Sequence, residues 1–188
     1  FVEAYNNLGN TLNELDKFDE AVKAYEEALK IQPDYLEVLN NLGKILNKIG
    51  QLDEAVKCYE KAIAINPEYA EAHNNLGITF TEVGQLDQAV KCYEKAIAIN
   101  PEYAEAHNNL GITLTEKGHL HEAVKCFTNA TAINLDYDEA YLNLGIALDK
   151  LGQSEEALNS YEKALEINPD YADAYNNIGD ILRGLGQL

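Results

Sequence analysis

The feature that most constrains this chain is a sequence repeat with a period of 34 residues. The stretch YEKAIAINPEYAEAHNNLGIT stands at residues 59–79 and returns, letter for letter, at 93–113. One glycine column keeps the same step: Gly9, Gly43, Gly77, Gly111, Gly145 and Gly179. A second follows seven residues behind, with Asp16 in its first position: Gly50, Gly84, Gly118, Gly152 and Gly186. A fixed period of this length is typical of stacked repeat architectures.

Each repeat contains two runs of apolar residues at helical spacing, and in the first repeat they cover 3–15 and 18–29. Since a period near 3.6 places such residues on one face, each run predicts an amphipathic helix. The second glycine column suits a left-handed residue at the end of the first helix. Prolines predict the end of the second helix, with Leu135 as the one exception: Pro33, Pro67, Pro101 and Pro169. A single pair of short helices cannot bury its own apolar faces, so neighbouring pairs must stack.

Small residues inside the predicted helices indicate close packing. Gly9 and Ala21 recur with their repeat equivalents, and a mid-helix glycine costs ~1 kcal/mol relative to alanine unless closer packing compensates. His73 and His107 stand in a column otherwise held by tyrosine and leucine. We expect these two side chains to pack between helices, each with one hydrogen bond.

The columns Tyr5-x-x-Leu8-Gly9-x-x-Leu12, Ala21-x-x-x-Tyr25, Ala28 and Pro33 closely resemble the tetratricopeptide repeat. The resemblance covers essentially the whole chain, although the usual tryptophan is absent. It implies an all-α fold, an α-solenoid in which antiparallel helix pairs wind into a right-handed superhelix. It also implies a concave groove lined by the first helix of each pair. The predicted single array, 1–188, divides into repeats at 2–35, 36–69, 70–103, 104–137 and 138–171, and into the first helix of a sixth repeat at 172–188.

Four columns on the polar face of the first helices are the candidate peptide-binding residues. The first column is acidic and continues at Asp173: Glu3, Glu37, Glu71, Glu105 and Glu139. The second is asparagine, with Leu142 breaking it before Asn176: Asn6, Asn40, Asn74 and Asn108. The third is asparagine throughout: Asn7, Asn41, Asn75, Asn109, Asn143 and Asn177. The fourth changes from polar to apolar along the chain: Asn10, Lys44, Ile78, Ile112 and Ile146.

Two asparagine columns on helices need a reason, because the amide competes with backbone hydrogen bonds. One interpretation is that the amides bind the main chain of an extended peptide, while the isoleucines contact its apolar side chains and the glutamates favour basic residues. The alternative is that a column bridges helices between repeats, which the sequence favours more for the Asn7 column than for the Asn6 column. The pattern also resembles the asparagine-ladder repeats of the O-linked N-acetylglucosamine transferases, which precede a catalytic domain.

Charge limits the classes of partner. Fourteen basic residues stand against 32 acidic ones, a net charge of −18, whereas nucleic-acid binding depends on Lys and Arg at phosphates. Nucleic acid and anionic membranes are therefore excluded as partners, and no apolar run is long enough to span a bilayer. Three cysteines share one repeat column, too widely spaced for a disulfide, which favours a reduced, cytoplasmic location: Cys58, Cys92 and Cys126. The chain begins at Phe1 without a methionine, so we expect both ends to be truncated.

No catalytic signature appears, and we predict neither an active site, a metal site nor a cofactor. His119, His121 and Cys126 would form an incomplete zinc set. The leading hypothesis is a non-catalytic scaffold that binds extended, basic or neutral segments of other proteins. Two alternatives stay open: the substrate-recognition arm of a larger enzyme such as a glycosyltransferase, and end-to-end self-association through apolar residues of the last helix, Ile178, Ile181 and Leu182.

Overall fold

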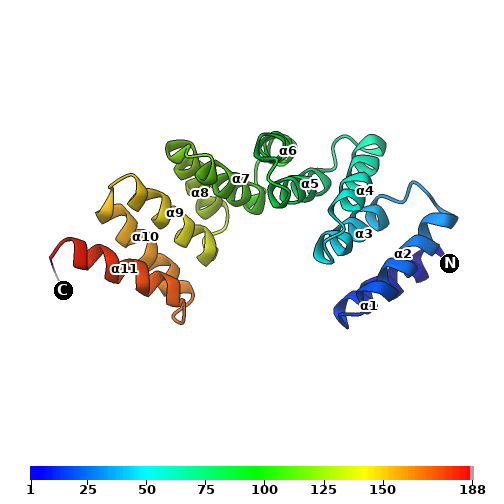
Figure 1. Cartoon of the computed structure of the whole chain (residues 1–188), viewed down its shortest axis with the longest axis horizontal. Coiled ribbons are helices and arrows are strands. Elements are labelled where there is room, and N and C mark those ends of the chain that lie inside the picture. Colours follow the sequence, from blue (N-terminus) through cyan, green and yellow to red (C-terminus); the bar gives the residue numbers. More distant parts are fainter. Residues whose placement is uncertain (187–188) are drawn as a thin grey trace. The chain divides into compact units, whose positions relative to one another are not determined.

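The computed structural model describes residues 1–186, and within them it forms eleven α-helices and no strand (Figure 1). The first helices of the repeats are α1 (Val2–Glu14), α3 (Leu36–Lys48), α5 (Ala70–Glu82), α7 (Ala104–Glu116), α9 (Asp138–Lys150) and α11 (Ala172–Gly184). The second helices are α2 (Phe18–Ile31), α4 (Leu52–Ile65), α6 (Leu86–Ile99), α8 (Leu120–Ile133) and α10 (Ser154–Ile167). The predicted all-α fold of stacked helix pairs is confirmed.

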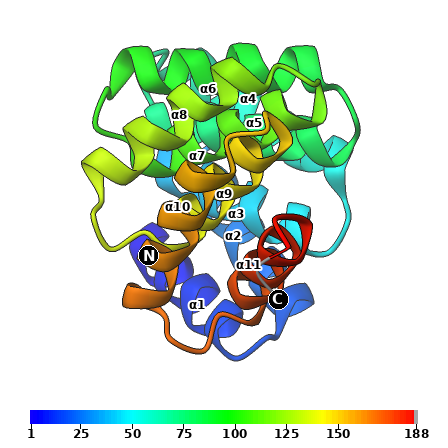
Figure 2. The same ribbon diagram turned by 90° about the vertical axis from the view of Figure 1, so that its left-hand side faces the viewer.

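The contacts divide the chain into two compact bodies. The N-terminal body, Phe1–Asn100, holds α1 to α6, and the C-terminal body, Pro101–Leu188, holds α7 to α11. In both, each first helix packs against the second helix of its own repeat and against the second helix of the preceding repeat, as α9 does with α10 and α8 (Figures 1 and 2). The path of the complete array stays a prediction.

Each helix pair packs through an aromatic ring pressed against a glycine. The rings are almost fully buried and come from the second helices: Tyr25, Tyr59, Tyr93, Phe127 and Tyr161. A methyl group added at Gly77 would lie 2.6 Å from the Tyr93 ring, and one at Gly145 would lie 2.4 Å from the Tyr161 ring. The close approach predicted from the glycine column is therefore confirmed, because only glycine leaves room for the ring.

The turn inside each repeat uses a left-handed residue. The second glycine column has φ between 66° and 79°, and Asp16, which replaces glycine in the first repeat, has φ 55°. This conformation brings the backbone N–H of Gln51 to the carbonyl of Leu46 at 2.8 Å, which satisfies one of the free carbonyls at the end of α3.

The turn between repeats does not require proline. Leu135 replaces the proline after α8, yet Asn134 has the same extended backbone (φ −121°) as the residues before the prolines. The Asn134 side chain accepts a hydrogen bond from the Asp136 N–H at 3.1 Å, and Asn66 does the same with Glu68 beside Pro67. The asparagine side chain thus stabilises this turn in either case.

Within each body, the first helices of successive repeats contact one another, as α3 does with α5 and α7 with α9. Among the described residues of the same bodies, second helices of successive repeats make no comparable contact. The first helices are therefore closer together, so the surface that they form is the inner side of each stack. We call it the first-helix face: α1, α3 and α5 in one body, and α7, α9 and α11 in the other.

Candidate peptide-binding face

The predicted site residues all belong to the first-helix face, but they differ in exposure. The Asn6 column is buried: Asn6, Asn40, Asn74 and Asn108. The Asn7 column is partly buried, from exposed Asn7 to buried Asn75, with Asn41, Asn109, Asn143 and Asn177 between these extremes. Side chains of the remaining columns are exposed or half-buried: Glu3, Glu37, Glu71, Glu105, Glu139, Asn10, Lys44, Ile78, Ile112 and Ile146. The acidic and fourth columns are therefore more accessible to a partner than the Asn6 column.

The two asparagine columns hydrogen-bond to each other between repeats. Asn75 Nδ2 donates to Asn40 Oδ1 at 2.9 Å in the N-terminal body. Asn143 Nδ2 donates to Asn108 Oδ1 at 3.2 Å in the C-terminal body. A buried amide needs such partners, because an unsatisfied polar group away from water is costly. Both columns therefore bridge successive first helices, including the column for which the sequence favoured peptide binding.

Leu142 ends this asparagine ladder by replacing the acceptor. It is buried in an apolar cluster with Leu148 and Ile181 instead. Asn177, the residue that would donate to this position, has no hydrogen bond to another side chain among the described residues. Where the acceptor is replaced, this hydrogen bond between successive first helices is therefore lost.

The buried asparagines also hold the acidic column. Asn6 Nδ2 donates to Glu37 Oε1 at 2.9 Å, from α1 to α3. Burial opposes ionisation of Glu71, but Lys44, through a hydrogen bond and its charge, together with hydrogen bonds to Asn40 and Tyr69, lowers the pKa of this carboxyl below its ordinary value. Hydrogen bonds from the asparagines therefore hold both carboxylates, and the lowered pKa keeps Glu71 charged at neutral pH.

Lys44 is the one basic residue in the fourth column, and it neutralises a carboxylate of the next repeat. Its ammonium group forms an ion pair with Glu71 across α3 and α5. Beside this pair, a small cavity of about 100 Å³ is lined by Lys44, Asn47, Tyr59, Asn75 and Ile78.

In the C-terminal body a larger cavity opens on the first-helix face. We call it the Tyr137 cavity; it measures about 520 Å³ and is lined by Tyr103, Ala104, Glu105, Asn134, Tyr137 and Glu139. Burial, followed by the charges of Glu139 and Glu105, raises the pKa of Tyr137 to about 12. Its hydroxyl therefore stays protonated at neutral pH and hydrogen-bonds the Asn108 side chain. Neither glutamate forms an ion pair among the described residues.

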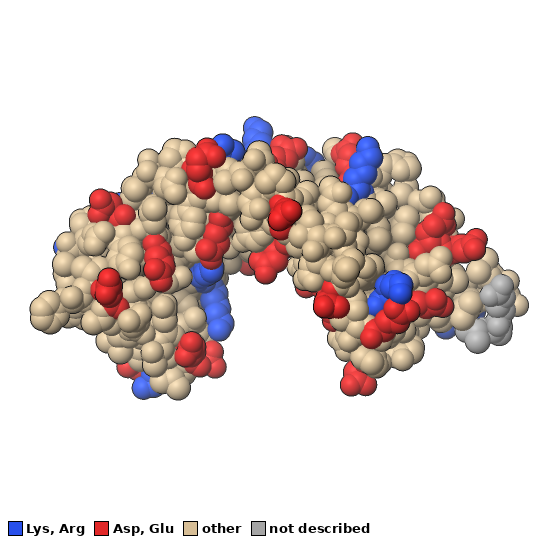
Figure 3. Space-filling view, turned by 180° about the vertical axis from the view of Figure 1, so that it is seen from behind, with Lys and Arg blue, Asp and Glu red and all other residues tan. Residues whose placement is uncertain are grey.

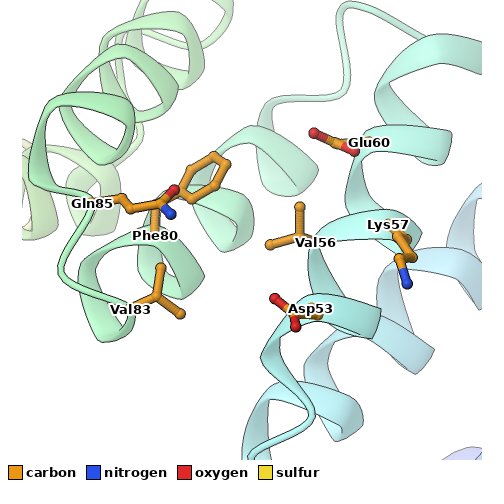
Figure 4. Close-up of a pocket in the computed structure, with 7 residues that line it drawn as sticks. All are labelled: Asp53, Val56, Lys57, Glu60, Phe80, Val83 and Gln85. Atoms are coloured by element: carbon orange, nitrogen blue, oxygen red, sulfur yellow. The ribbon is translucent and has the colours of Figure 1, made fainter.

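A pocket on another surface was not predicted from the sequence. It measures about 410 Å³ and lies between α4 and the end of α5, lined by Asp53, Val56, Lys57, Glu60, Phe80, Val83 and Gln85. Figure 4 shows Val56 and the Phe80 ring turned toward each other across this space. The only sequence signal is the phenylalanine itself, since the equivalent residue in the other full repeats is leucine.

Other groups with chemical potential have structural partners. His73 Nε2 lies 3.0 Å from the Pro67 carbonyl and His107 Nε2 lies 3.1 Å from that of Pro101, as the sequence predicted for packed histidines. Burial raises the pKa of the Cys58 and Cys92 thiols to about 11, so neither is a thiolate at neutral pH. Within residues 1–186 no three His, Cys, Asp or Glu side chains are grouped for a metal ion.

Carboxylates dominate the charged surface. On the side drawn in Figure 3, acidic side chains are spread over both bodies, and basic ones are fewer. None of the helices of the described chain has the length and apolarity to cross a membrane.

The sequence matches the family model of the C-terminal domain of cilia and flagella-associated protein 70, a tetratricopeptide-repeat domain, over residues 2–188. The chain belongs to this family. No protein of curated function matches it. The family assignment confirms the resemblance to tetratricopeptide repeats and identifies the chain as a member of a class of protein-interaction folds.

Solved structures of other repeat proteins have the same fold. A crystal structure of MamA is 29% identical with a TM-score of 0.77, and the match covers 87% of this chain and 96% of that one. YrrB is described as a tetratricopeptide-repeat protein with an unusual peptide-binding site. It is 25% identical with a TM-score of 0.72, and the match covers 92% of this chain and 89% of YrrB. PilF of Pseudomonas aeruginosa is 19% identical with a TM-score of 0.89, and the match covers 99% of this chain and 85% of PilF. At this identity it supports the fold alone.

Proposed function

We propose that this chain is a non-catalytic scaffold that binds extended segments of partner proteins on its first-helix face. The observation that carries the proposal is the row of glutamates beside half-buried isoleucines on the inner side of each stack. The family is a protein-interaction fold, and one structural neighbour is described by its peptide-binding site.

The chemistry of the face favours basic or neutral segments. Glu37, Glu105 and Glu139 are exposed, whereas the buried asparagines hydrogen-bond to groups of the neighbouring repeat. Specificity therefore comes from the carboxylates and the isoleucine column rather than from amides that bind a peptide main chain, as the sequence had suggested. A net charge of −18 adds long-range attraction for basic partners.

Charge reversal on the two sides of the stack tests the proposal. One variant carries Glu37→Lys, Glu105→Lys and Glu139→Lys on the first-helix face. The matched control carries Glu54→Lys, Glu94→Lys and Glu155→Lys, which are exposed positions on second helices. Each variant changes the net charge by the same amount, so non-specific electrostatic effects are equal.

We expect wild type and control to capture the same proteins from a cell lysate, and the first-helix variant to lose them while its circular dichroism stays helical. Capture of the same set by all three proteins would overturn the proposal. The same face would serve if the array selects substrates for an attached enzyme, and the complete reading frame separates that case from a free-standing scaffold.

A further inference from the structure

Two sets of four residues, two repeats apart, occupy equivalent positions on the first-helix face and differ at one of them. In the N-terminal body the set is Asn40, Lys44, Tyr69 and Glu71. In the C-terminal body it is Asn108, Ile112, Tyr137 and Glu139. The asparagine, tyrosine and glutamate are common to both, and only lysine is replaced by isoleucine.

The first set already holds an ammonium group. Lys44 forms an ion pair with Glu71, and the same carboxylate hydrogen-bonds the side chains of Asn40 and Tyr69. The chain itself thus shows that a glutamate held by an asparagine and a tyrosine at these positions pairs with a lysine side chain.

The second set has the same binding groups without an internal lysine. Glu139 is exposed and has no ion pair among the described residues, and Tyr137 hydrogen-bonds Asn108 on α7. In addition, the Tyr137 cavity of about 520 Å³ brings Glu105 from α7 to the same space as Glu139 from α9. Two carboxylates and two tyrosines therefore surround a cavity large enough to admit a side chain.

We propose that the Tyr137 cavity binds a lysine or arginine side chain of the partner segment, in the role that Lys44 has at Glu71. This rests on the proposed function and names one subsite of it. The carboxylates supply charge-assisted acceptors for the ammonium or guanidinium group, and a tyrosine ring attracts a cation over its face. Ala104 and the tyrosine rings, which also line the cavity, offer apolar surface to the methylene groups of the bound side chain.

Nuclear magnetic resonance of the uniformly ¹⁵N-labelled chain tests this with three probes. The probes are the peptides acetyl-Ala-Ala-X-Ala-Ala-amide, in which X is lysine, arginine or norleucine. We expect saturable shifts of the backbone amides of Glu105, Tyr137 and Glu139 with the lysine and arginine peptides, and none with norleucine. Equal shifts with norleucine, or shifts spread over all acidic residues, would overturn the proposal.

Variants then identify the site. Glu139→Gln should lower the affinity for the lysine peptide by about tenfold or more, because a hydrogen bond to a charged group is lost. Glu162→Gln removes the same charge at an exposed position on α10 and should leave the affinity unchanged. A similar loss in both variants would reduce the effect to net charge and would reject the cavity as the site.

An exchange of the differing residue provides the sharpest comparison. Ile112→Lys should pair an internal ammonium group with Glu139, as Lys44 pairs with Glu71, and so compete with the peptide and abolish its binding. Lys44→Ile places at that position the residue that three other repeats carry, so folding should be retained, and it should create a second site with new shifts at Tyr69 and Glu71. If neither exchange changes the number of sites, the proposal is wrong.

The outcome is separable from that of the proposed function. If the lysine peptide does not bind but the charge-reversed first-helix variant still loses its captured proteins, the proposed scaffold function is supported. Its partners are then recognised by other chemistry. If the capture experiment fails as well, the first-helix face is not the binding surface.

Discussion

At the scale of single residues, the glycines of the Gly9 column make room for an aromatic ring, except for the last member, Gly179. Gly77 is pressed against the Tyr93 ring, whereas nothing lies within 4 Å of a methyl group added at Gly179. The same residue type in the same column is therefore required in one repeat and dispensable in another. The sequence shows that glycine recurs in this column, and only the packing shows which of these glycines are required.

Replacing these two glycines by alanine should change stability in opposite directions. Gly77→Ala forces a methyl group into a buried ring and should lower the free energy of unfolding by about 1–3 kcal/mol. Gly179→Ala meets no neighbour and should raise it by up to about 1 kcal/mol, since alanine is the better helix former. Urea unfolding followed by circular dichroism measures both. Effects of the same sign would show that helix propensity, rather than ring packing, decides this column.

Glu71 provides a pH-dependent prediction at the same scale. Its pKa in the folded chain is lower than its ordinary value of 4.5, so its charged form stabilises the fold above that pH, and the contribution is lost as the pH falls through the folded pKa. Glu71→Gln should therefore be less stable than wild type at pH 7, with a difference that shrinks below pH 4.5. The control is Glu162→Gln. A difference that stays constant from pH 7 to pH 3 would contradict the role assigned to the ion pair.

At the scale of elements, the asparagine ladder joins neighbouring first helices. Asparagine is unfavourable inside a helix, yet both columns persist because each buried amide satisfies its counterpart in the next repeat. The sequence shows both columns but not their pairing, because the partners are 35 residues apart and only the stacking distance brings them together. The pairing supports the alternative that these columns bridge neighbouring repeats, and peptide binding by the amides stays a prediction.

Breaking one hydrogen bond of the ladder should lower the free energy of unfolding more than changing a residue at its interrupted end. Asn75→Leu leaves the buried Asn40 Oδ1 without that donor and should lower the free energy of unfolding by about 1–3 kcal/mol. Asn177→Leu, opposite Leu142, should have an effect within about 0.5 kcal/mol of zero. Denaturant unfolding of the two variants decides the matter, and equal losses would mean that the amide pair does not stabilise the contact.

At the scale of the whole molecule, charge is the dominant property. Fourteen basic residues against 32 acidic ones leave a net charge of −18, and several ion pairs among the described residues, such as Lys30–Glu27 and Lys163–Glu166, are exposed. Exposed pairs contribute little to stability, so the repulsion between like charges is the larger electrostatic effect.

Salt should therefore stabilise this protein. Raising NaCl from 20 mM to 500 mM at pH 7 screens the repulsion and should raise the melting temperature in a thermal scan. At pH 4.4, near the isoelectric point, the same change in salt should have much less effect, because little net charge remains to be screened. A melting temperature that falls with salt at pH 7 would show that attractive pairs dominate instead.

The sequence by itself determined the local structure of this protein: the helix pairs, the left-handed turns, the close approach of helices at small residues and the hydrogen-bonded histidines. These features depend on residues close together in the chain or on a fixed repeat, so periodicity and residue type reveal them. Only the tertiary structure decided which polar side chains are satisfied and which remain available. Lys44 at Glu71, Asn75 at Asn40 and the cavity beside Glu139 depend on the distance between neighbouring helices. No property of the single positions encodes that distance.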